Sequence, residues 1–508
     1  MKFFVGLNRN KEVATPCVRF LTLGFACLTA LVVLGPACSD KSSDEEDASV
    51  SDGTLPTDGD LPTDGTLPTD GEAVDGSTPG DCGEINTFEH GQTPLSEIHV
   101  AQGGSDTSGD GSEANPFATI SRAAGEADPG TAIRVHAGAY EGGAYLADLA
   151  GTAEAPIWIG GVAGEERPVI QGGGQALHLV RPRYVIVHDL EVTGQTANGI
   201  NADDGGDYAN NLAAHHVVFR NLLIHTVGSG GNQDCLKLSG LNHFYVLDSE
   251  FHHCGGGSAG SAVDCVGCHH GLIAGNHMHS LHEGGNAVQT KGGSEDIEIR
   301  ANLIIDGGQR GLLMGGSTGF AYFRPPLSTD EENVEARNIR ALSNIFVGGV
   351  AAVAFVGCVD CIAANNTIVN PTRWILRILQ ETTSEGDYLF APCRDGRFVN
   401  NIVYFDRSAL STWINVGPNT QAESFQFSHN LWYAHDDPSL SQPTNLPAAE
   451  TAGIYEQDPG LGDDHQITPG SPAAGAGAPV AEVFGDFFGN CYADPPSIGA
   501  HEVAPPSP

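Results

Sequence analysis

Basic residues are scarce in this chain of 508 residues. Lys and Arg together number 23 against 63 Asp and Glu, which gives a formal net charge of −40. A nucleic-acid partner needs a basic surface, so this balance argues against one. Long apolar runs are also lacking: the run from Phe20 to Leu34 is about 15 residues, and a membrane-spanning helix needs roughly 20.

Two common catalytic signatures are missing as well. The glycine-rich stretches at 228–231 and 255–257 lack a following helix and a Lys-Ser or Lys-Thr pair, so they do not predict phosphate binding. No Gly-x-Ser-x-Gly sequence with suitable Asp and His partners indicates an esterase. Glycine itself is abundant, with 67 residues, which is typical of a chain with many tight turns and few helices.

The first 38 residues have the features of an export signal of lipoprotein type. A basic start precedes the apolar run, and Pro36-Ala37-Cys38 provides a small-residue cleavage site, although Gly35 stands where such signals usually have leucine. We expect lipid attachment at Cys38 and a location at the outer membrane or cell surface, with the lipid as the only link to a membrane. Simple secretion and a retained anchor are the alternatives.

Residues 39–94 are predicted to form a disordered acidic linker. The segment is poor in apolar residues and repeats Leu-Pro-Thr-Asp-Gly from positions 55, 61 and 67. Such a composition cannot bury enough surface to fold. One Asp in every six residues also does not supply the converging oxygens of a calcium loop. With a short tail at 503–508, the folded domain is expected to span 95–502.

Short repeated patterns organise that domain. Five segments repeat one strand-like pattern, namely Asp234-Cys-Leu-Lys-Leu-Ser-Gly, Ala262-Val-Asp-Cys-Val-Gly-Cys, Ala287-Val-Gln-Thr-Lys-Gly-Gly, Arg310-Gly-Leu-Leu-Met-Gly-Gly and Ala352-Val-Ala-Phe-Val-Gly-Cys. A second column places a polar residue before apolar ones, at Asp189, Asn221, Asp248, Asn276, Asn302, Asn344, Asn366, Asn401 and Asn430. Gaps mostly in the twenties, lengthened by insertions, predict a solenoid, and short apolar strands with turn glycines make it a β-solenoid.

The polar column is expected to stack at a bend, where side-chain amides cap backbone groups and bond along the stack. Residues one and three places after it are both apolar in six of nine cases, as in Leu222/Ile224 and Leu303/Ile305. This favours strands that face the core at those positions. The residue two places after the column is often apolar too, so the sequence does not decide which residues of each strand face the core.

The beginning and end of the domain carry a family resemblance. A strand is predicted at 98–101, a helix at 116–127 with Thr119 as N-cap, and a strand at 132–140. The motifs Pro116-Phe-Ala-Thr-Ile and Pro129-Gly-Thr-x-Ile-x-Val-x-x-Gly-x-Tyr140 resemble the opening of parallel β-helix proteins of the pectate-lyase-like superfamily. Asp486-Phe-Phe-Gly-Asn and Ser497-Ile-Gly-Ala-His-Glu502 resemble their closing segment. The resemblance implies an all-β fold, a right-handed parallel β-helix with a short N-terminal capping helix.

Nine cysteines follow Cys38, at 82, 235, 254, 265, 268, 358, 361, 393 and 491. Export makes disulfides the expected state, and nine cysteines leave one unpaired. Cys265-x-x-Cys268 and Cys358-x-x-Cys361 could together suggest zinc. They lie about four rungs apart, however, so disulfides or buried thiols are favoured.

Many enzymes of the resembled superfamily are lyases of uronic-acid polymers, which implies an acidic polysaccharide or cell-surface glycan as partner. Elimination next to a carboxylate needs a base and a cation that takes up the developing charge. The resemblance implies Lys291 or Lys237 as base, Arg310 or Arg324 as anion clamp, and calcium held by Asp234 and Asp264. Further substrate contacts are expected from Tyr322, Trp374 and Gln289, because inserted loops rich in aromatics and arginine suit sugar rings and carboxylates.

The strand Gln289-Thr-Lys291-Gly-Gly-Ser loosely resembles the catalytic stretch of alginate-lyase and chondroitinase-B-type enzymes. It departs from them where Gly284 and Asn286 replace the expected carboxylates and Met314 replaces an arginine. Aligned on their closing residues, the repeats place Asp264 beside Gln289 and Lys291 beside Met314. The same alignment puts Lys237 in the column between, which faces the opposite way.

Two other functions remain open alongside the lyase. One is a non-catalytic surface module for glycan binding or adhesion. The other is a glycoside hydrolase, for which Asp203, Asp204, Asp234 and Asp264 are the candidate carboxylates. For each of these functions the protein is expected to be a monomer. Histidines cluster between 243 and 282, and His277 and His279 with Glu283 could bind a metal. Stacked structural histidines are the alternative, since these positions carry Leu and Ile elsewhere in the ladder.

Overall fold

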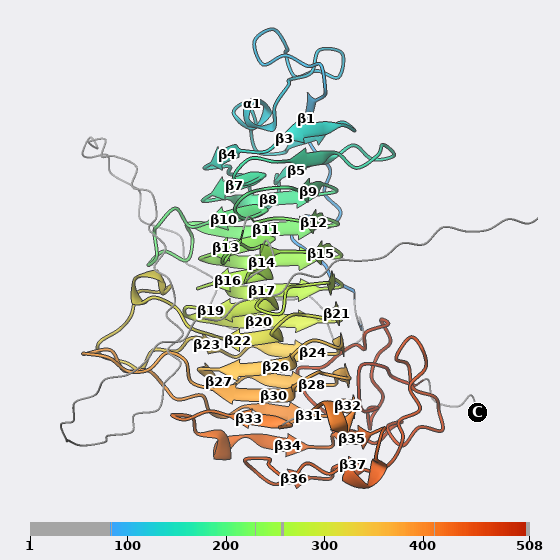
Figure 1. Ribbon diagram of the computed structural model, residues 1–508. Coiled ribbons are helices and arrows are strands. Elements are labelled where there is room, and N and C mark those ends of the chain that lie inside the picture. The colour runs from blue at the N-terminus through green and yellow to red at the C-terminus, as the bar shows by residue number, and fades with distance from the viewer. Residues whose placement is uncertain (1–81, 83, 229, 256–258, 411, 504–508) are drawn as a thin grey trace, which may run out of the picture. The chain divides into compact units, whose positions relative to one another are not determined.

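The computed structural model describes residues 82, 84–228, 230–255, 259–410 and 412–503. Through them the chain winds as a right-handed parallel β-helix in which successive coils add one strand to each of three parallel sheets (Figure 1). This confirms the fold expected from the repeats. The predictions for the export signal, Cys38 and residues 39–81 lie outside the described residues.

The three sheets run along the whole coil. The first sheet has the order β1 (Ser96–Val100), β2 (Thr131–Val135), β5 (Ile157–Gly161), β8 (Arg183–His188), β11 (Ala214–Arg220), β14 (Leu241–Leu247), β17 (His269–Ala274), β20 (Ser294–Arg300), β24 (Arg340–Leu342), β28 (Ile362–Ala364), β31 (Arg397–Val399), β34 (Gln426–Ser428) and β36 (Glu450–Thr451), with β23 (Ala336–Arg337) and β27 (Cys358–Val359) at its side. The second sheet has the order β4 (Ala144–Ala147), β7 (Leu177–Val180), β10 (Ile200–Asp203), β13 (Leu236–Ser239), β16 (Ser261–Val266), β19 (Asn286–Lys291), β22 (Arg310–Gly315), β26 (Ala351–Val356), β30 (Trp374–Leu379) and β33 (Ile414–Val416). The third sheet has the order β3 (Ala139–Glu141), β6 (Val169–Gln171), β9 (Glu191–Thr193), β12 (Leu223–His225), β15 (Glu250–His252), β18 (His277–His279), β21 (Leu303–Ile305), β25 (Ile345–Val347), β29 (Thr367–Val369), β32 (Ile402–Phe405), β35 (Leu431–Ala434) and β37 (Ile454–Tyr455).

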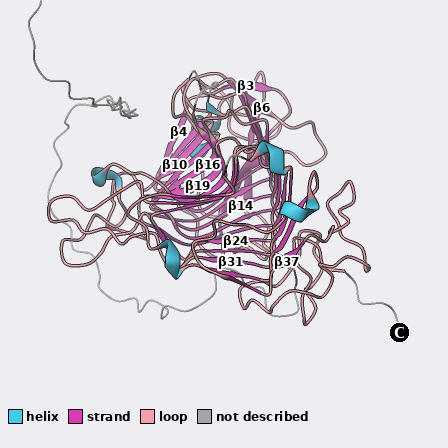
Figure 2. Ribbon diagram, turned by 60° about the horizontal axis from the view of Figure 1, so that its bottom comes forward, coloured by secondary structure: helices cyan, strands magenta, loops and turns pink. Residues whose placement is uncertain are grey.

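Strand alternation separates the core from the outer faces. In β13, Leu236 and Leu238 are fully buried in the continuous core, whereas Lys237 and Ser239 point away from it. The longer loops extend outward around the strands (Figure 2). They include the short 3₁₀ turns η2 (Phe320–Tyr322), η3 (Arg407–Ala409), η4 (Ala422–Ser424) and η5 (Pro438–Leu440).

A buried asparagine ladder runs along the bend before the third sheet. The side-chain Nδ2 of Asn276 donates to Oδ1 of Asn302 at 2.9 Å and to the carbonyl of Val246 at 2.9 Å, and its backbone N–H donates to the same Oδ1 at 3.0 Å. The pattern continues through Asn344, Asn366 and Asn401 to Asn430, whose Nδ2 donates to Glu450. The stacking predicted for these asparagines is therefore confirmed.

The first three members assigned to that column were wrong by one residue. Asp189, Asn221 and Asp248 have φ values of 54°, 50° and 50° and occupy the left-handed turn position outside the ladder, in register with Gly275. Leu190, Leu222 and Ser249 take the inward place instead. The residues that face the core therefore differ by one position between the early and the later strands of the third sheet. Ile224 faces the core from β12, but in β21 the inward residue is Ile304, between half-exposed Leu303 and Ile305.

The N-terminal end of the coil is covered as predicted. Helix α1 (Ile120–Ala124) buries Ile120 and Ala123, and its N-cap Thr119 accepts the backbone N–H of Arg122 at 3.1 Å. The predicted 132–140 strand is divided into β2 and β3. Among the described residues no helix is long and apolar enough to cross a bilayer.

Residues 84–94, which the composition assigns to the linker, lie against the first sheet. Ile85 and Phe88 pack on an outer apolar cluster that includes Val218, and Glu89 forms a 2.8 Å ion pair with Arg220. Cys82 is disulfide-bonded to Cys491. The folded unit thus begins before residue 95.

The C-terminal segment packs along the side of the coil. The backbone N–H of Ala500 donates to Thr367 Oγ1 at 3.0 Å, and Asn365 Nδ2 donates to the Ser497 carbonyl at 3.1 Å. Ser497 is fixed in turn by Glu502, which accepts its backbone N–H and its hydroxyl at 2.7 Å each.

Cysteine pairing departs from the expectation of one unpaired thiol. Cys235–Cys254 and Cys358–Cys361 are bonded besides Cys82–Cys491, whereas Cys265, Cys268 and Cys393 are buried free thiols. Because Cys358 and Cys361 bond each other, they are not available to join Cys265 and Cys268 in a zinc site.

Candidate functional site

One column on the outer face of the second sheet contains three of the predicted site residues, Lys237, Asp264 and Gln289. The register pairs Asn201 with Lys237, Lys237 with Asp264, and Asp264 with Gln289. The same column continues through Leu313 and Ala354 to Arg377. Lys291 lies two residues along its strand, in the adjacent outward column and in register with Val266.

The prediction that Lys237 faces away from Asp264 is therefore wrong, and Met314 pairs with Thr290 instead of Lys291. The repeated segments were aligned on their last residue. Some of them end with one glycine after the strand and others with two residues, so this alignment can be wrong by one position. The register aligns Gly240 with Gly267 and Gly292. A one-residue slip sends a side chain to the opposite face of a strand.

An ion cluster forms where this column crosses β13, β16 and β19. Lys237 Nζ pairs with Asp264 Oδ2 and lies 3.4 Å from Asp234 Oδ2, while Lys291 Nζ lies 3.8 Å from the same Asp264 oxygen. The two carboxylates are only 1% exposed, whereas the lysine side chains are 19% and 13% exposed. Asp234 is further fixed by the backbone N–H of Ser261, which donates to its Oδ1 at 2.7 Å.

The cluster drives its two carboxyl pKa values apart. Burial raises the pKa of Asp234 to about 7, with Lys237 opposing the shift and Asp264 adding to it. Burial acts in the same direction on Asp264, but Lys237 and Lys291 outweigh it and lower the pKa of that carboxyl. Burial also acts to lower the pKa of Lys237, but Asp264 and Asp234 raise it overall, so Lys237 stays an ammonium at neutral pH.

A signal that would have singled out this cluster is the distribution of lysine. Lys237 and Lys291 are the only lysines after residue 41. In a chain with a net charge of −40, both meet at one carboxylate on one face. Two lysines that only served solubility would not have to converge, so their position is set by the two buried carboxylates that they pair with.

More cations lie further along the same sheet. Arg310 on β22 forms an ion pair with Glu381, and its Nε is buried without a hydrogen-bond partner. The Trp374 ring on β30 contacts two guanidinium groups, with its centroid 4.0 Å from that of Arg373 and 4.2 Å from that of Arg377. Burial, and the nearby charge of Arg310, lower the pKa of Arg377 to about 10. Trp374 thus lies on a strand, and Arg377 is a site residue that the sequence analysis did not select.

Arg324 and Tyr322 sit on the loop after β22 and differ in accessibility. The Arg324 guanidinium is buried, pairs with Asp204 and stacks on the Tyr208 ring at 4.0 Å. Its Nη1 donates to the carbonyl of Tyr322 at 2.9 Å, and the Tyr322 side chain is 49% exposed. Arg324 therefore anchors the loop, and Tyr322 is the member of the pair that can meet a ligand.

Calcium fits this cluster poorly. Asp234 Oδ2 and Asp264 Oδ1 lack hydrogen bonds, which would leave them available to bind a hard cation. However, the Lys237 ammonium lies against both carboxylates. Two ammonium groups already balance two carboxylates, so little negative charge remains to hold a divalent ion. Calcium would have to displace Lys237 from the position that it occupies.

The raised pKa of Asp234 predicts a pH-dependent effect of Asp234→Asn. An acid whose folded pKa exceeds its unfolded value of about 4 stabilises the fold below pH 4 and loses that contribution as the pH rises through about 7. The amide cannot ionise and is spared this loss. The stability difference between the variant and the wild type should therefore shift in favour of the variant from pH 5 to pH 8, by at most about 3 kcal/mol. Thermal melts at both pH values measure this. A variant that loses more stability at pH 8 than at pH 5 would show that the native form is the carboxylate.

No protein-family model matches the chain, and no curated protein sequence is significantly similar to it. Among solved structures it is similar to pectate lyase Pel9A, with 16% identity and a TM-score of 0.49 over 82% of this chain and 98% of that one. It is also similar to the GH136 lacto-N-biosidase of Eubacterium ramulus, with 14% identity and a TM-score of 0.46 over 71% and 67% of the two chains. For the alginate lyase of Paenibacillus sp. str. FPU-7 the values are 16% and 0.39, over 63% and 97%. These similarities concern the course of a parallel β-helix, so function has to be argued from the residues of this chain.

Proposed function

We propose that the protein binds an acidic polysaccharide along the outer face of the second sheet and cleaves it as a lyase. The observation that carries the proposal is the convergence of Lys237 and Lys291 on Asp264. Because the pKa of Asp234 is raised to about 7, the two ammonium groups outweigh the carboxylates below that pH, and this local positive charge attracts a polyanion where the rest of the acidic surface repels it.

The outer column supports a ligand that lies over its N-terminal part. It begins at the exposed Tyr145 on β4, in register with His178, and continues through Asn201 to Lys237. These three steps of about 4.8 Å span about 14 Å. Further along the column Leu313 and Ala354 are buried among apolar side chains, so the column is covered before it reaches Arg377. An aromatic side chain at one end and the lysines at the other suit sugar rings that carry carboxylates.

The elimination assigns different roles to the two lysines. Lys291 in its neutral form takes the proton from the carbon next to the uronate carboxylate, the bond from the adjacent carbon to the glycosidic oxygen breaks, and the departing oxygen takes a proton from solvent. Asp264 stabilises the ammonium that forms on Lys291. Lys237 remains charged and offsets the charge that develops on the substrate carboxylate.

A hydrolase is the second candidate, favoured by one observation. Asp234 has a pKa of about 7 and Asp264 a lowered one, and two carboxyl groups with diverging pKa values can divide the acid and base roles of glycoside hydrolysis. Their 1% exposure argues against it, because neither carboxyl reaches the surface where a polymer would lie. A glycan-binding module without catalysis is the remaining outcome.

The proposal includes an extracellular location with a lipid anchor at Cys38. The three disulfides support export, since such bonds persist in oxidising compartments. An acidic linker would then hold the β-helix away from the membrane. Acylation of Cys38 is tested by mass spectrometry of the mature N-terminal peptide, and an unmodified peptide from the cell fraction would contradict it.

The deciding experiment is incubation of the protein with pectate, alginate and glycosaminoglycans. A lyase leaves an unsaturated uronate that absorbs ultraviolet light. New reducing ends without that absorbance would indicate the hydrolase instead. Retention on a polymer column without either product would leave a binding module, and no product and no binding would overturn the proposal.

Chelation of calcium should leave the lyase rate unchanged. The reason is that the Lys237 ammonium supplies the positive charge between Asp234 and Asp264. Initial rates of ultraviolet absorbance with EDTA, and with EDTA plus excess calcium, measure the effect. A loss of most of the activity with EDTA that calcium restores would show that calcium displaces Lys237.

A further inference from the structure

A group of histidine and glutamate side chains lies on the outer face of the third sheet, away from the lysine cluster. Ile224, Phe251 and Met278 fill the core at the centres of β12, β15 and β18, so the residues on either side of them point outward. One outward column holds Glu191, Leu223, Glu250, His277 and Leu303, and the other holds Thr193, His225, His252, His279 and Ile305. His277 and His279 therefore do share positions with Leu and Ile, but that face is the outer one.

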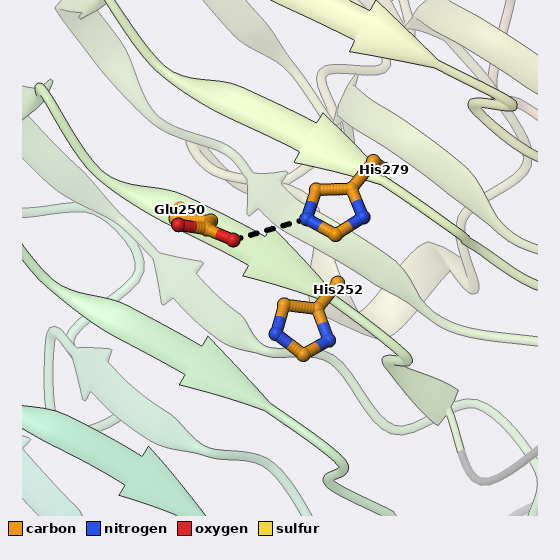
Figure 3. A group of neighbouring side chains, drawn as sticks. All are labelled: Glu250, His252 and His279. Carbon is orange, nitrogen blue, oxygen red and sulfur yellow. Dashed lines mark hydrogen bonds and ion pairs between the residues drawn. The ribbon is translucent and has the colours of Figure 1, made fainter.

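Three of these residues converge closely. Glu250, His252 and His279 each offer one ligand atom, and these atoms all lie within 4.8 Å of one another (Figure 3). His279 Nε2 is 3.1 Å from Glu250 Oε1. A tetrahedral zinc ion with bonds of about 2.1 Å separates its ligands by about 3.4 Å, so this pair already has the required spacing and His252 needs only a small shift.

Neighbouring residues hold the other nitrogen of each ring. The Nδ1 atom of His279 is 3.1 Å from Ser280 Oγ, and the Nδ1 atom of His252 is 2.7 Å from His253 Nδ1. Ser280 and His253 both follow the strand in the left-handed conformation, with φ of 53°. Such outer contacts fix the orientation of an imidazole and leave Nε2 for a metal ion.

A third histidine lies beside the site. His277 adds a buried Nε2 without a hydrogen-bond partner, and its ring lies 4.6 Å from that of His279.

A second histidine stack provides a comparison. His216, His243 and His270 stack at 4.8 and 5.0 Å on the first sheet, much as His225, His252 and His279 do at 4.7 and 4.9 Å. Within the described ranges, only the stack on the third sheet brings three or more His, Cys, Asp or Glu ligand atoms so close together. Stacking alone therefore does not explain the position of Glu250.

We propose that Glu250, His252 and His279 bind a divalent transition-metal ion of the zinc, copper or nickel class, with the fourth position left to water. Nitrogen donors with one carboxylate favour these ions over calcium and magnesium, which prefer oxygen ligands. The ion would join β15 and β18, which lie on successive rungs. This site is independent of the proposed lyase activity.

The test is isothermal titration of the untagged full-length protein, freed of metal, with zinc chloride and separately with magnesium chloride. We expect one zinc ion per chain with a Kd in the micromolar range or below, and no binding of magnesium over the same range of metal concentrations. His252→Asn and His279→Asn should each weaken zinc binding by about 10- to 100-fold. His243→Asn, in the other stack, is the matched control and should bind zinc as the wild type does.

Cobalt binding gives a second readout, which does not depend on the heat measured by titration. The visible absorbance of a tetrahedral cobalt complex should appear with the wild type and with His243→Asn, and disappear with Glu250→Gln, whose circular dichroism confirms folding. No zinc binding by the wild type would overturn the site. So would equal losses in His243→Asn and His252→Asn, because zinc would then be held by scattered histidines.

Discussion

Replacing Lys291 by methionine should lower the rate of unsaturated-product formation by about 100- to 10,000-fold, the usual contribution of a general base. The fold should survive, because Asp264 keeps its pairing with Lys237 when the Lys291 ammonium is lost. Ultraviolet absorbance with the polymer that the wild type cleaves measures the rate, and a thermal melt measures the folded state.

Lys291→Arg separates catalysis from binding. Arginine keeps the positive charge but does not give up a proton at accessible pH, so it can attract the polymer without acting as a base. This variant should retain binding on a polymer column and lose the product. Arg134→Met, on the outer face of the first sheet, removes a cation far from the site and should leave the rate unchanged. A Lys291→Met variant with the full wild-type rate would exclude Lys291 as the base.

Lys237→Met should act differently from Lys291→Met. Removing the ammonium between Asp234 and Asp264 leaves two buried carboxylates less compensated, and breaking such a buried pair costs about 3–5 kcal/mol. Its effect should therefore appear first as a lower melting temperature. Such a contrast would show that Lys237 also holds the cluster together, whereas Lys291 is the residue that reacts. A Lys237→Met variant that melts like the wild type would contradict this structural role.

Asn302→Ala should destabilise the coil by about 3–6 kcal/mol. Asn302 is fully buried, accepts two hydrogen bonds from Asn276 and donates to Asn344 Oδ1 and the carbonyl of Ile273. Alanine removes the acceptor of the Asn276 backbone N–H and the donor to the Ile273 carbonyl, whereas Asn276 Nδ2 keeps the Val246 carbonyl and Asn344 Oδ1 keeps the backbone N–H of residue 302. Each buried group that loses its partner costs about 1–3 kcal/mol. Thermal and denaturant unfolding monitored by circular dichroism measure the loss.

The neighbouring Ala301→Gly variant provides the control. Ala301 has a φ of 51° and lies at the left-handed turn position next to Asn302, on the same rung. Glycine is at ease in that conformation, so this variant should keep or slightly raise the melting temperature. If Asn302→Ala were as stable as Ala301→Gly, the asparagine ladder would contribute nothing to the stability of the fold. The asparagines would then be tolerated at the bend without stabilising it.

The sequence predicted the fold well because its repeats are local. Each coil repeats an apolar strand, a turn and an inward polar residue, and this signal survives the insertion that separates Asn302 from Asn344. The capping helix was predicted for the same reason, since Thr119 and the apolar face after it are neighbours in the chain. The linker was misjudged at its end, because Ile85 and Phe88 are two apolar residues in a polar segment and their partner surface is distant in the sequence.

The site was predicted only in part. Asp234, Asp264, Lys237 and Lys291 were all selected, but two errors of one residue placed Lys237 on the wrong face and Asp189 in the wrong column. A strand alternates every residue, so a repeat whose closing turn varies in length cannot fix the face. The carboxylate partner of His279 was likewise sought in Glu283, nearby in the sequence, whereas Glu250 supplies it from the preceding rung.

The amino-acid sequence alone thus determined that the chain coils, where the coil begins, and which polar residue types recur along it. Only the tertiary structure decided which of them meet, because neighbours on successive rungs are some 27 residues apart in the chain and their contact depends on strand register. It also decided their charge states. Asp234 and Asp264 are the same amino acid, and their pKa values diverge because burial dominates at one and two ammonium groups dominate at the other.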